Sequence, residues 1–143
     1  MTSPLFLGID GGGTRCRARL ADAGGRTLGE GVGGAANIRL GLDVAWNAIM
    51  QAVDGALAQA GLGRDVLSGT AIGLGLAGIT NATDQQRVAD SAPVTFAGIL
   101  SDTDAYTACL GAHAGADGAI LISGTGSAAQ IIINGVGRGI GGW

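Results

Sequence analysis

The first glycine-rich segment of the sequence joins a carboxylate, three glycines and a hydroxyl in a pattern that suits phosphate binding. Its residues are Asp10, Gly11, Gly12, Gly13 and Thr14. The backbone N–H groups of such a turn can surround a phosphate, and the Thr14 hydroxyl adds a donor. Asp10 ends an apolar run and can accept the waters of a hydrated Mg²⁺. A plain hairpin, in which the glycines only supply positive φ and Asp10 caps the turn, is the alternative.

The residues after this turn exclude a dinucleotide-binding motif. A glycine turn of that class leads from a strand into a helix whose N-terminus faces the pyrophosphate. Here residues 14–20 alternate between apolar and polar side chains, as a strand does. The third glycine of such a motif started at Gly11 would also fall on Cys16. We therefore expect a β-hairpin turn.

A second segment near the end of the chain repeats this design. An apolar run over residues 119–123 leads into Gly124, Thr125, Gly126 and Ser127. Two facing hairpins could hold the β- and γ-phosphates of ATP from opposite sides. Backbone N–H groups and the charge of Mg²⁺ would then compensate for lysine, because the sequence contains none. The lack of lysine also excludes a Walker A loop, a protein-kinase ATP clamp and a Schiff base.

Two aspartates after the apolar run 96–100 are candidates for a general base. Phosphoryl transfer to a hydroxyl needs a carboxylate that accepts the proton, and a strand-to-helix junction holds such a group rigidly. Asp102 and Asp104 both stand at such a junction. The alternative is that both only cap the helix expected from Thr103, because aspartate is a preferred cap.

The hydrophobic pattern predicts the element order β-β-β-α-β-α-β-α over residues 1–116. Continuous apolar runs are typical of strands buried on both faces, and alternating runs of strands with one wet face. The expected strands are 5–9, 14–20, 27–32, 71–79 and 96–100. Apolar residues at three- and four-residue spacing indicate a helix over 41–60, and shorter helices are expected over 83–90 and 103–114. The first, fourth and fifth strands should be parallel.

Residues 117–143 are expected to begin a second domain. Three strand patterns joined by glycine-containing turns follow one another there, at 119–123, 128–133 and 136–140. A chain of 143 residues can hold one ordinary domain with a true core and the start of another.

Composition and charge narrow the class of partner. The net charge is −3 and the eight cations are arginines scattered along the chain, so no basic stripe for nucleic acid or anionic lipid is formed. The sequence has no apolar run of 18 residues, which argues against a membrane partner. Its two cysteines, Cys16 and Cys109, fit neither a disulfide framework nor a metal site. We expect a cytoplasmic protein with a small-molecule partner.

The motifs, taken in order, resemble the BadF/BadG/BcrA/BcrD-type ATPase family. They are Asp-Gly-Gly-Gly-Thr (10–14), Gly-Leu-Ala-Gly (75–78), Thr-Asp-Ala (103–105) and Leu-Ile-Ser-Gly-Thr-Gly-Ser (121–127), with Gly-Gly-Trp at 141–143. Within the family the chain is similar to N-acetylglucosamine and glucosamine kinases, which belong to the actin, Hsp70 and hexokinase superfamily. The resemblance implies an α/β, ribonuclease-H-like (actin-like ATPase) domain with a mixed sheet of five strands, plus the opening β-meander of a second such domain. It also implies ATP and Mg²⁺ as cofactors and phosphoryl transfer to a hydroxyl of an amino sugar.

The resemblance further implies roles for individual residues. Asp10 would organise Mg²⁺, while Gly11–Thr14 and Gly124–Ser127 would form the two phosphate loops. Asp104, in the Thr-Asp-Ala motif, would be the catalytic base and contact the acceptor hydroxyl. Asn37 would hydrogen-bond the sugar, and its alternative is a loop asparagine that bonds its own backbone.

Other functions stay open. An ATPase that activates a radical CoA-ester dehydratase or reductase is the alternative within the family, although Cys16 and Cys109 are poorly placed to bridge an iron–sulfur cluster between subunits. A nucleotide-binding structural or regulatory actin-like protein is the alternative from another class. The fragment alone could also be inactive, because the adenine pocket of this superfamily lies largely in the second domain. Exposed edges of an incomplete sheet would favour a homodimer.

Overall fold

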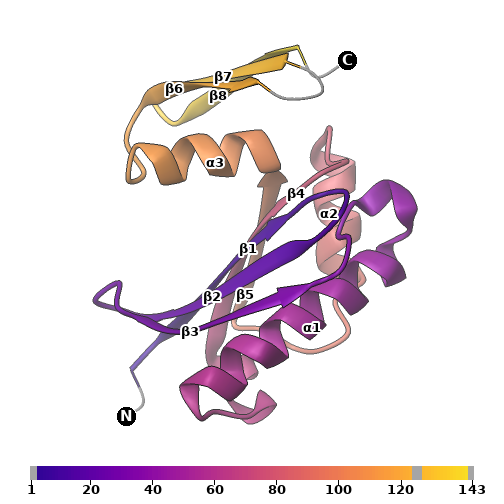
Figure 1. Ribbon diagram of the computed structural model, residues 1–143, viewed down its shortest axis with the longest axis vertical. Coiled ribbons are helices and arrows are strands. Elements are labelled where there is room, and N and C mark those ends of the chain that lie inside the picture. Colours follow the sequence, from indigo (N-terminus) through magenta and orange to yellow (C-terminus); the bar gives the residue numbers. More distant parts are fainter. Residues whose placement is uncertain (1–2, 124–126, 142–143) are drawn as a thin grey trace.

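The computed structural model describes residues 3–123 and 127–141, and its first layer is a mixed five-stranded sheet (Figure 1). The strands are β1 Leu5–Gly11, β2 Cys16–Asp22, β3 Thr27–Gly33, β4 Thr70–Leu76 and β5 Gly98–Thr103. Their order is β3-β2-β1-β4-β5. β1 is antiparallel to β2 and parallel to β4, and β4 is parallel to β5. The prediction of five strands, with the first, fourth and fifth parallel, is confirmed.

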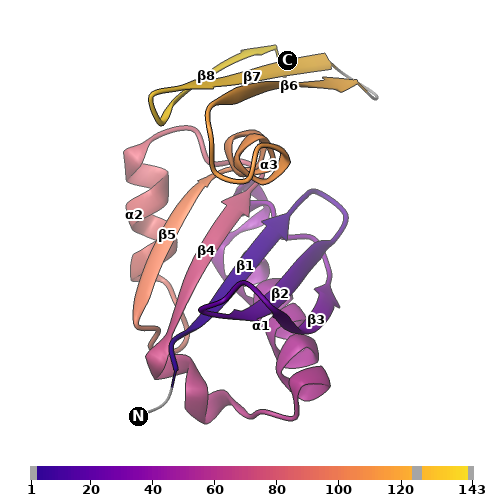
Figure 2. The same ribbon diagram turned by 90° about the vertical axis from the view of Figure 1, so that its left-hand side faces the viewer.

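Three α-helices accompany this sheet in the described part of the chain. They are α1 Leu42–Ala60, α2 Ala82–Asp90 and α3 Asp104–Ala112, with the short 3₁₀ helices η1 Ile38–Leu40 and η2 Arg64–Gly69. α1 and α2 lie on one side of the sheet, whereas α3 lies between it and a second sheet (Figure 1). The carboxyl ends of β1, β4 and β5 all point toward α3 (Figure 2). Candidate residues that follow these strands therefore lie at one end of the sheet.

One face of the sheet forms the core against α1 and α2. Leu7 and Ile9 of β1 are buried and alternate with exposed residues, and Ile72 and Leu74 of β4 continue the same face. α1 contributes an apolar stripe at helical spacing. Buried members of this stripe include Trp46, Ile49, Val53 and Leu57. The core thus fixes the strands whose ends carry the candidate residues.

α1 packs directly against the edge strand β3, because the facing residues are small. Gly29, Gly31 and Gly33 alternate along β3. A Cβ on any of them would clash with a backbone carbonyl oxygen of α1. The α1 residues concerned are Ala48, Ala52 and Ala56. Part of the high glycine content is therefore explained by the packing of β3 on α1, and not by ligand binding.

A second, three-stranded antiparallel sheet follows α3. Its strands are β6 Gly118–Ser123, β7 Ser127–Ile133 and β8 Val136–Gly141. Cys109 of α3 is fully buried against this sheet, with its Sγ 3.5 Å from the carbonyl oxygen of Gly118. Asn134 and Gly135 both have positive φ, as a two-residue hairpin turn requires. The expected meander is confirmed, while its status as a second domain from residue 117 stays a prediction.

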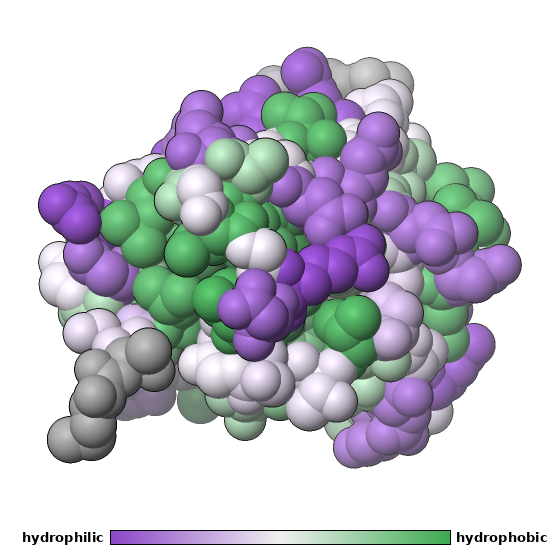
Figure 3. All heavy atoms as spheres, turned by 90° about the horizontal axis from the view of Figure 1, so that it is seen from below, coloured by the Kyte–Doolittle hydropathy of each residue, from purple (hydrophilic) through white to green (hydrophobic). Residues whose placement is uncertain are grey.

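The face of the first sheet away from α1 is incompletely covered. Phe6 is 46 % exposed and Leu100 is 81 % exposed there. Hydrophobic surface is also visible from the lower side of the molecule (Figure 3). Asp10 lies on this same face, because it follows Phe6 by an even number of residues along β1. The candidate site therefore opens on the side that α1 and α2 leave free.

Candidate functional site

Three residues at the carboxyl end of the first sheet lie in one row across neighbouring strands. Asp10 of β1 pairs with Gly75 of β4, and Gly75 pairs with Asp102 of β5. Residues directly opposite in neighbouring strands point to the same face, so both carboxylates lie on the side away from α1. Two strand spacings place their Cα atoms about 10 Å apart. The strand register thus brings three residues that are far apart in the sequence to the carboxyl end of the sheet.

The Asp10 carboxylate is available to a ligand. The residue is exposed, and it forms no ion pair within the described residues, although Arg17 lies opposite on β2. A fully buried Asp10 bonded to an arginine would be unable to accept the waters of an ion. The geometry is therefore compatible with the expected metal role, which stays a prediction.

The first glycine turn is a hairpin loop over residues 12–15. Gly11 and Cys16 form the last pair of the ladder, and the N–H of Gly12 donates to the carbonyl oxygen of Arg15 at 3.0 Å. The second strand begins at Cys16, two residues later than expected, because the loop takes up Thr14 and Arg15. The expected hairpin turn is confirmed.

Packing explains one glycine of this turn but not another. A Cβ on Gly11 would lie 2.6 Å from Leu76 Cδ2 and 3.0 Å from Ala36 Cβ, so packing alone requires glycine there. No described atom lies within 4 Å of a Cβ built on Gly13, and neither Gly13 nor Gly12 has a positive φ. The interpretation that these glycines only supply positive φ is therefore wrong. The backbone at Gly13 is instead open to close approach by a ligand.

Hydrogen bonds join this turn to two other candidate segments. The Gly12 carbonyl oxygen accepts the N–H of Ala36 at 2.9 Å, next to Asn37. The Gly11 carbonyl oxygen accepts the N–H of Ala77 at 2.8 Å, inside the Gly-Leu-Ala-Gly motif. Three stretches that are far apart in the sequence thus form one hydrogen-bonded cluster.

Asn37 is half-buried and caps the 3₁₀ helix η1. Its Oδ1 accepts the N–H of Arg39 at 2.9 Å, which is the backbone-bonding role considered as the alternative. Its Nδ2 group has no hydrogen-bond partner within the part of the chain that the structure describes. Asn37 therefore combines a fixed orientation with an unused donor, and the two interpretations are compatible.

The two candidate aspartates flank the residue that caps α3. The N-cap is Thr103, whose Oγ1 accepts the N–H of Tyr106 at 3.0 Å. Asp102 Oδ1 accepts the N–H of Thr103 at 2.7 Å, and Asp104 Oδ1 accepts the N–H of Ala105 at 2.9 Å. Asp104 is exposed, whereas Asp102 is half-buried. Thr103 is the N-cap, but the Ala105 N–H is one of the free first-turn donors of α3, so a capping role for Asp104 stays open beside the proposed one.

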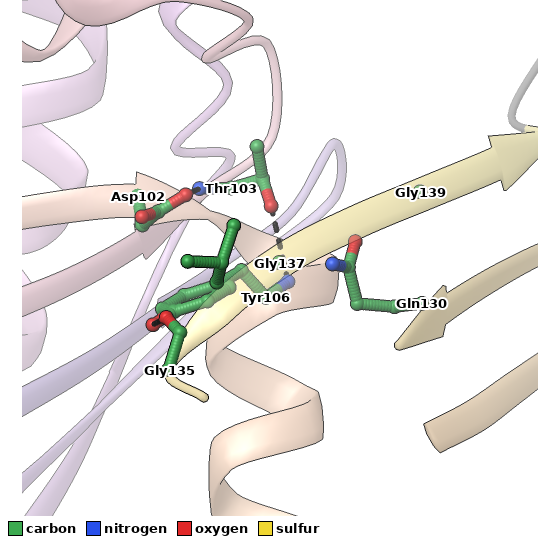
Figure 4. A pocket seen from close by; sticks show the side chains of 8 residues that line it. Asp102, Thr103, Tyr106, Gln130, Gly135, Gly137 and Gly139 are labelled. Carbon is green, nitrogen blue, oxygen red and sulfur yellow. Dashed lines mark hydrogen bonds between the residues drawn. The ribbon is translucent and has the colours of Figure 1, made fainter. Parts of the chain in front are cut away.

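A pocket of about 480 Å³ lies between the N-terminal half of α3 and the second sheet, and Asp102 lines it (Figure 4). The Tyr106 hydroxyl donates to the carbonyl oxygen of Gly135 at 2.9 Å on one side of the pocket. The remaining lining residues are Thr103, Gln130, Val136, Gly137 and Gly139. Asp104 does not line this pocket, so the two aspartates have different surroundings.

The second predicted phosphate turn cannot be placed. Gly124, Thr125 and Gly126 lie outside the described residues, and Ser127 is described only through its backbone, which pairs with Ser123. The flanking strands β6 and β7 are antiparallel neighbours, as a hairpin requires. Whether this turn faces the first one stays a prediction.

The sequence analysis missed an ion pair beside Asn37 between a buried carboxylate and a half-exposed arginine. Asp84 of α2 is 4 % exposed, and its Oδ2 lies 3.0 Å from Arg39 Nη2. The sequence does indicate a helix start here, because Asn81, three residues before Asp84, is a typical N-cap. In the structure its Oδ1 accepts the N–H of Asp84 at 2.8 Å. No spacing in the sequence indicates that an arginine 45 residues away is the partner.

Comparison with known proteins accounts for this arrangement. A family model matches residues 7–143, a range that includes every motif named above. It describes the BadF/BadG/BcrA/BcrD ATPase family. The chain belongs to this family. The resemblance inferred from the motifs is therefore confirmed.

Several relatives of this BadF/BadG/BcrA/BcrD-type chain are sugar kinases by name. Glucosamine kinase GspK of Vibrio cholerae is 44 % identical over 130 residues, which are 91 % of this chain and 44 % of that protein. A Chromobacterium violaceum structure assigned as an N-acetylglucosamine kinase has a TM-score of 0.88 at 39 % identity, covering 97 % of this chain and 49 % of that one. A ROK family glucokinase from Streptomyces griseus, solved with glucose and AMPPNP, has a TM-score of 0.61 at 23 % identity, covering 94 % and 46 %.

These comparisons confirm the predicted actin-like ATPase fold. The glucokinase, at its lower identity, supports the fold alone. The chain spans a little under half the length of each of these three relatives.

Proposed function

We propose that this chain is the nucleotide-binding part of an ATP-dependent kinase that phosphorylates a hydroxyl of an amino sugar. The observation that carries the proposal is the cluster that hydrogen bonds form between the first turn, the segment of Asn37 and the Gly-Leu-Ala-Gly motif, with the exposed Asp10 at the end of β1 beside it. The 44 % identity to a glucosamine kinase supports the substrate class.

Mg-ATP fits the residues at this end of the sheet. The backbone at Gly13 is open, and the N–H groups of Gly13 and Thr14 have no hydrogen-bond partner within the described residues. In our proposal they donate to phosphate oxygens, and the exposed Asp10 holds the waters around Mg²⁺. The ion, when bound, neutralises charge on the transferred phosphoryl group. Gly124–Ser127 supplies donors from the opposite side.

In the proposed reaction Asp104 accepts the proton of the acceptor hydroxyl. The sugar oxygen forms a bond to the γ-phosphorus in line, as the bond from that phosphorus to the β,γ-bridging oxygen breaks, which yields a sugar phosphate and ADP. The hydrogen bond from Ala105 N–H orients the carboxylate through Oδ1 and leaves Oδ2 for the proton. Asn37 donates from Nδ2 to the sugar and fixes its position.

The buried cysteines favour this function over activation of a radical dehydratase. Such an activator holds an iron–sulfur cluster between subunits through cysteine ligands. Cys16 and Cys109 are both 0 % exposed, so neither can reach a second subunit without rearrangement.

The proposal extends to the organisation of the whole protein. A second domain begins at residue 117, and free edges of the sheets allow a homodimer. We also propose that the protein works in the cytoplasm, where ATP is available. No helix in residues 3–123 or 127–141 has the length and hydropathy needed to cross a membrane.

The test is a coupled ADP-release assay on the protein expressed from its complete reading frame. Glucosamine, N-acetylglucosamine, glucose and no sugar are compared at equal concentrations of Mg-ATP. We expect ADP release to depend on the sugar, with kcat/KM for one of the amino sugars about tenfold or more above that for glucose. ADP release at the same rate without any sugar would contradict the proposal.

A further inference from the structure

Asp84 is a charged side chain in an unusual place. Among the described residues it is the only buried side chain that carries a carboxylate or a guanidinium group, and it lies on the nine-residue helix α2. Burying a carboxylate costs free energy unless hydrogen bonds and an opposite charge compensate it. The cap of α2 is already provided by Asn81. Asp84 also accepts the N–H of Thr80, the residue before this cap, so it helps to hold the helix start, and its contact with Arg39 is the part that goes beyond that role.

The hydrogen-bond partners of Asp84 belong to the loop after the Gly-Leu-Ala-Gly motif and to η1, while its Oδ1 lies 3.9 Å from Arg87 Nη1 of the same helix. Its Oδ2 accepts the backbone N–H of Thr80 at 2.9 Å and the Thr80 hydroxyl at 2.9 Å. It also accepts Arg39 Nη2 at 3.0 Å, and the same Nη2 group donates to Thr80 Oγ1 at 3.1 Å. One carboxylate oxygen thus holds two segments together.

These two segments carry the candidate sugar ligand. The backbone N–H of Arg39 fixes Asn37 Oδ1 at 2.9 Å. Gly78 has a φ of +90°, and a Cβ there would clash with Asn37 Oδ1 and lie 3.1 Å from Arg39 Cγ. The N–H of Ile38 donates to the Ala77 carbonyl oxygen at 3.2 Å. A shift of the loop at Gly78, or of the backbone at Arg39, would therefore move the asparagine.

We propose that Asp84 is a positioning residue for sugar binding, which acts through Thr80 and Arg39 to fix the side chain of Asn37. This inference rests on the proposed kinase function. It assigns the Asp84–Arg39 pair to the sugar site, because Thr80 and Arg39 both adjoin the segments that hold Asn37, although Ala77 of the same loop also donates to Gly11 of the phosphate turn. ATP binding should depend on it less than sugar binding does.

The experiment is a set of variants of the protein from its complete reading frame, assayed by ADP release. For Asp84→Asn we expect the KM for the amino sugar to rise about tenfold or more, with kcat changed by less than about threefold and the KM for ATP unchanged. Asp90→Asn is the matched control, because Asp90 is an exposed carboxylate on the same helix whose side chain bonds only to Gln86 among the described residues. It should leave all three constants at wild-type values.

Thr80 gives a second, independent test if Asp84→Asn folds poorly. Thr80→Val removes the hydroxyl at nearly constant volume, whereas Thr80→Ser keeps it. We expect the valine variant to raise the sugar KM several-fold and the serine variant to restore it. Melting temperatures are measured in parallel, because a purely structural role would lower them and leave the sugar KM unchanged.

The outcomes separate the two proposals. An active wild type whose sugar KM is the same in Asp84→Asn, or in Thr80→Val, would overturn the positioning role and leave the kinase function standing. A wild type that phosphorylates no amino sugar would overturn both.

Discussion

At the residue scale, the candidate base is distinguished by its surroundings rather than by its type. Asp102 and Asp104 each accept one backbone N–H at the start of α3. Asp102 is half-buried and lines a pocket against the second sheet, whereas Asp104 is exposed. Thr103 between them performs the capping. The role of Asp104 therefore has to be tested by chemistry.

Asp104→Asn should abolish most phosphoryl transfer while ATP binding stays nearly intact. Loss of a general base costs about 10²- to 10⁴-fold in rate, and the phosphate turn and Asp10 are untouched. Turnover is measured by ADP release, and binding by calorimetry with AMPPNP. Asp102→Asn is the matched comparison and should keep most of the activity. An inactive Asp102→Asn beside an active Asp104→Asn would reverse the assignment.

At the element scale, the seam between β3 and α1 determines how the sheet edge is held. Gly31 faces the backbone of α1, and a Cβ there would clash with the Ala52 carbonyl oxygen. A backbone atom inside a helix cannot rotate away as a side chain can. Gly31 aligns through Ala18 with Ile9 and points toward α1, on the opposite face of the sheet from Asp10, so its effect should be on stability.

Gly31→Ala should therefore destabilise the protein by about 1–3 kcal/mol, as overpacking typically does. Gly8→Ala is the matched control on β1, because no described atom lies within 4 Å of a Cβ built there. It should change the free energy of unfolding by less than about 0.5 kcal/mol. Urea denaturation followed by circular dichroism measures both. Equal stabilities of the two variants would refute the close packing of α1 on β3.

The contacts of α2 also predict a dependence of stability on pH. Hydrogen bonds from the Thr80 backbone N–H and hydroxyl, together with the charges of Arg39 and Arg87, hold the pKa of Asp84 below its ordinary value, although burial acts in the opposite direction. Its stabilising contribution is therefore complete above the pKa of about 4 of the unfolded chain. It is lost as the pH falls through the lower pKa of the folded state.

The melting temperatures of wild type and Asp84→Asn should consequently differ at pH 7, begin to approach each other as the pH falls below about 4, and converge only once the pH has passed the lowered pKa of the folded state. Asp90→Asn serves again as the control and should follow the wild type throughout. A difference between wild type and Asp84→Asn that stays constant from pH 7 to pH 2 would rule out this linkage.

The elements themselves were largely predictable from the sequence. The helical stripe of α1 and one face of β1 and β4 reflect burial, which hydrophobic periodicity records directly, whereas the continuous runs of β1 and β5 also contain the exposed Phe6 and Leu100. The start of β2 was expected two residues early, because alternation continues through a loop that periodicity does not detect. The pairing of Arg39 with Asp84 was not predictable, because it depends on how η1 and α2 approach in three dimensions.

At the scale of the whole molecule, the site is assembled from one end of one sheet. Asp10, the first turn and Asn37 are joined by the register and by short backbone hydrogen bonds. The chain spans less than half of its kinase relatives, and large apolar residues of its second sheet are exposed, Leu121 by 78 % and Ile140 by 71 %. The complete reading frame is therefore the proper material for testing activity.

The most direct test of the central claim is the identity of the product. The protein from its complete reading frame is incubated with Mg-ATP and glucosamine or N-acetylglucosamine, and the reaction is followed by ³¹P NMR. We predict a new phosphomonoester resonance from the sugar phosphate that grows in a one-to-one ratio with ADP and is absent without sugar. Growth of inorganic phosphate in place of that resonance, with either sugar, would contradict the account.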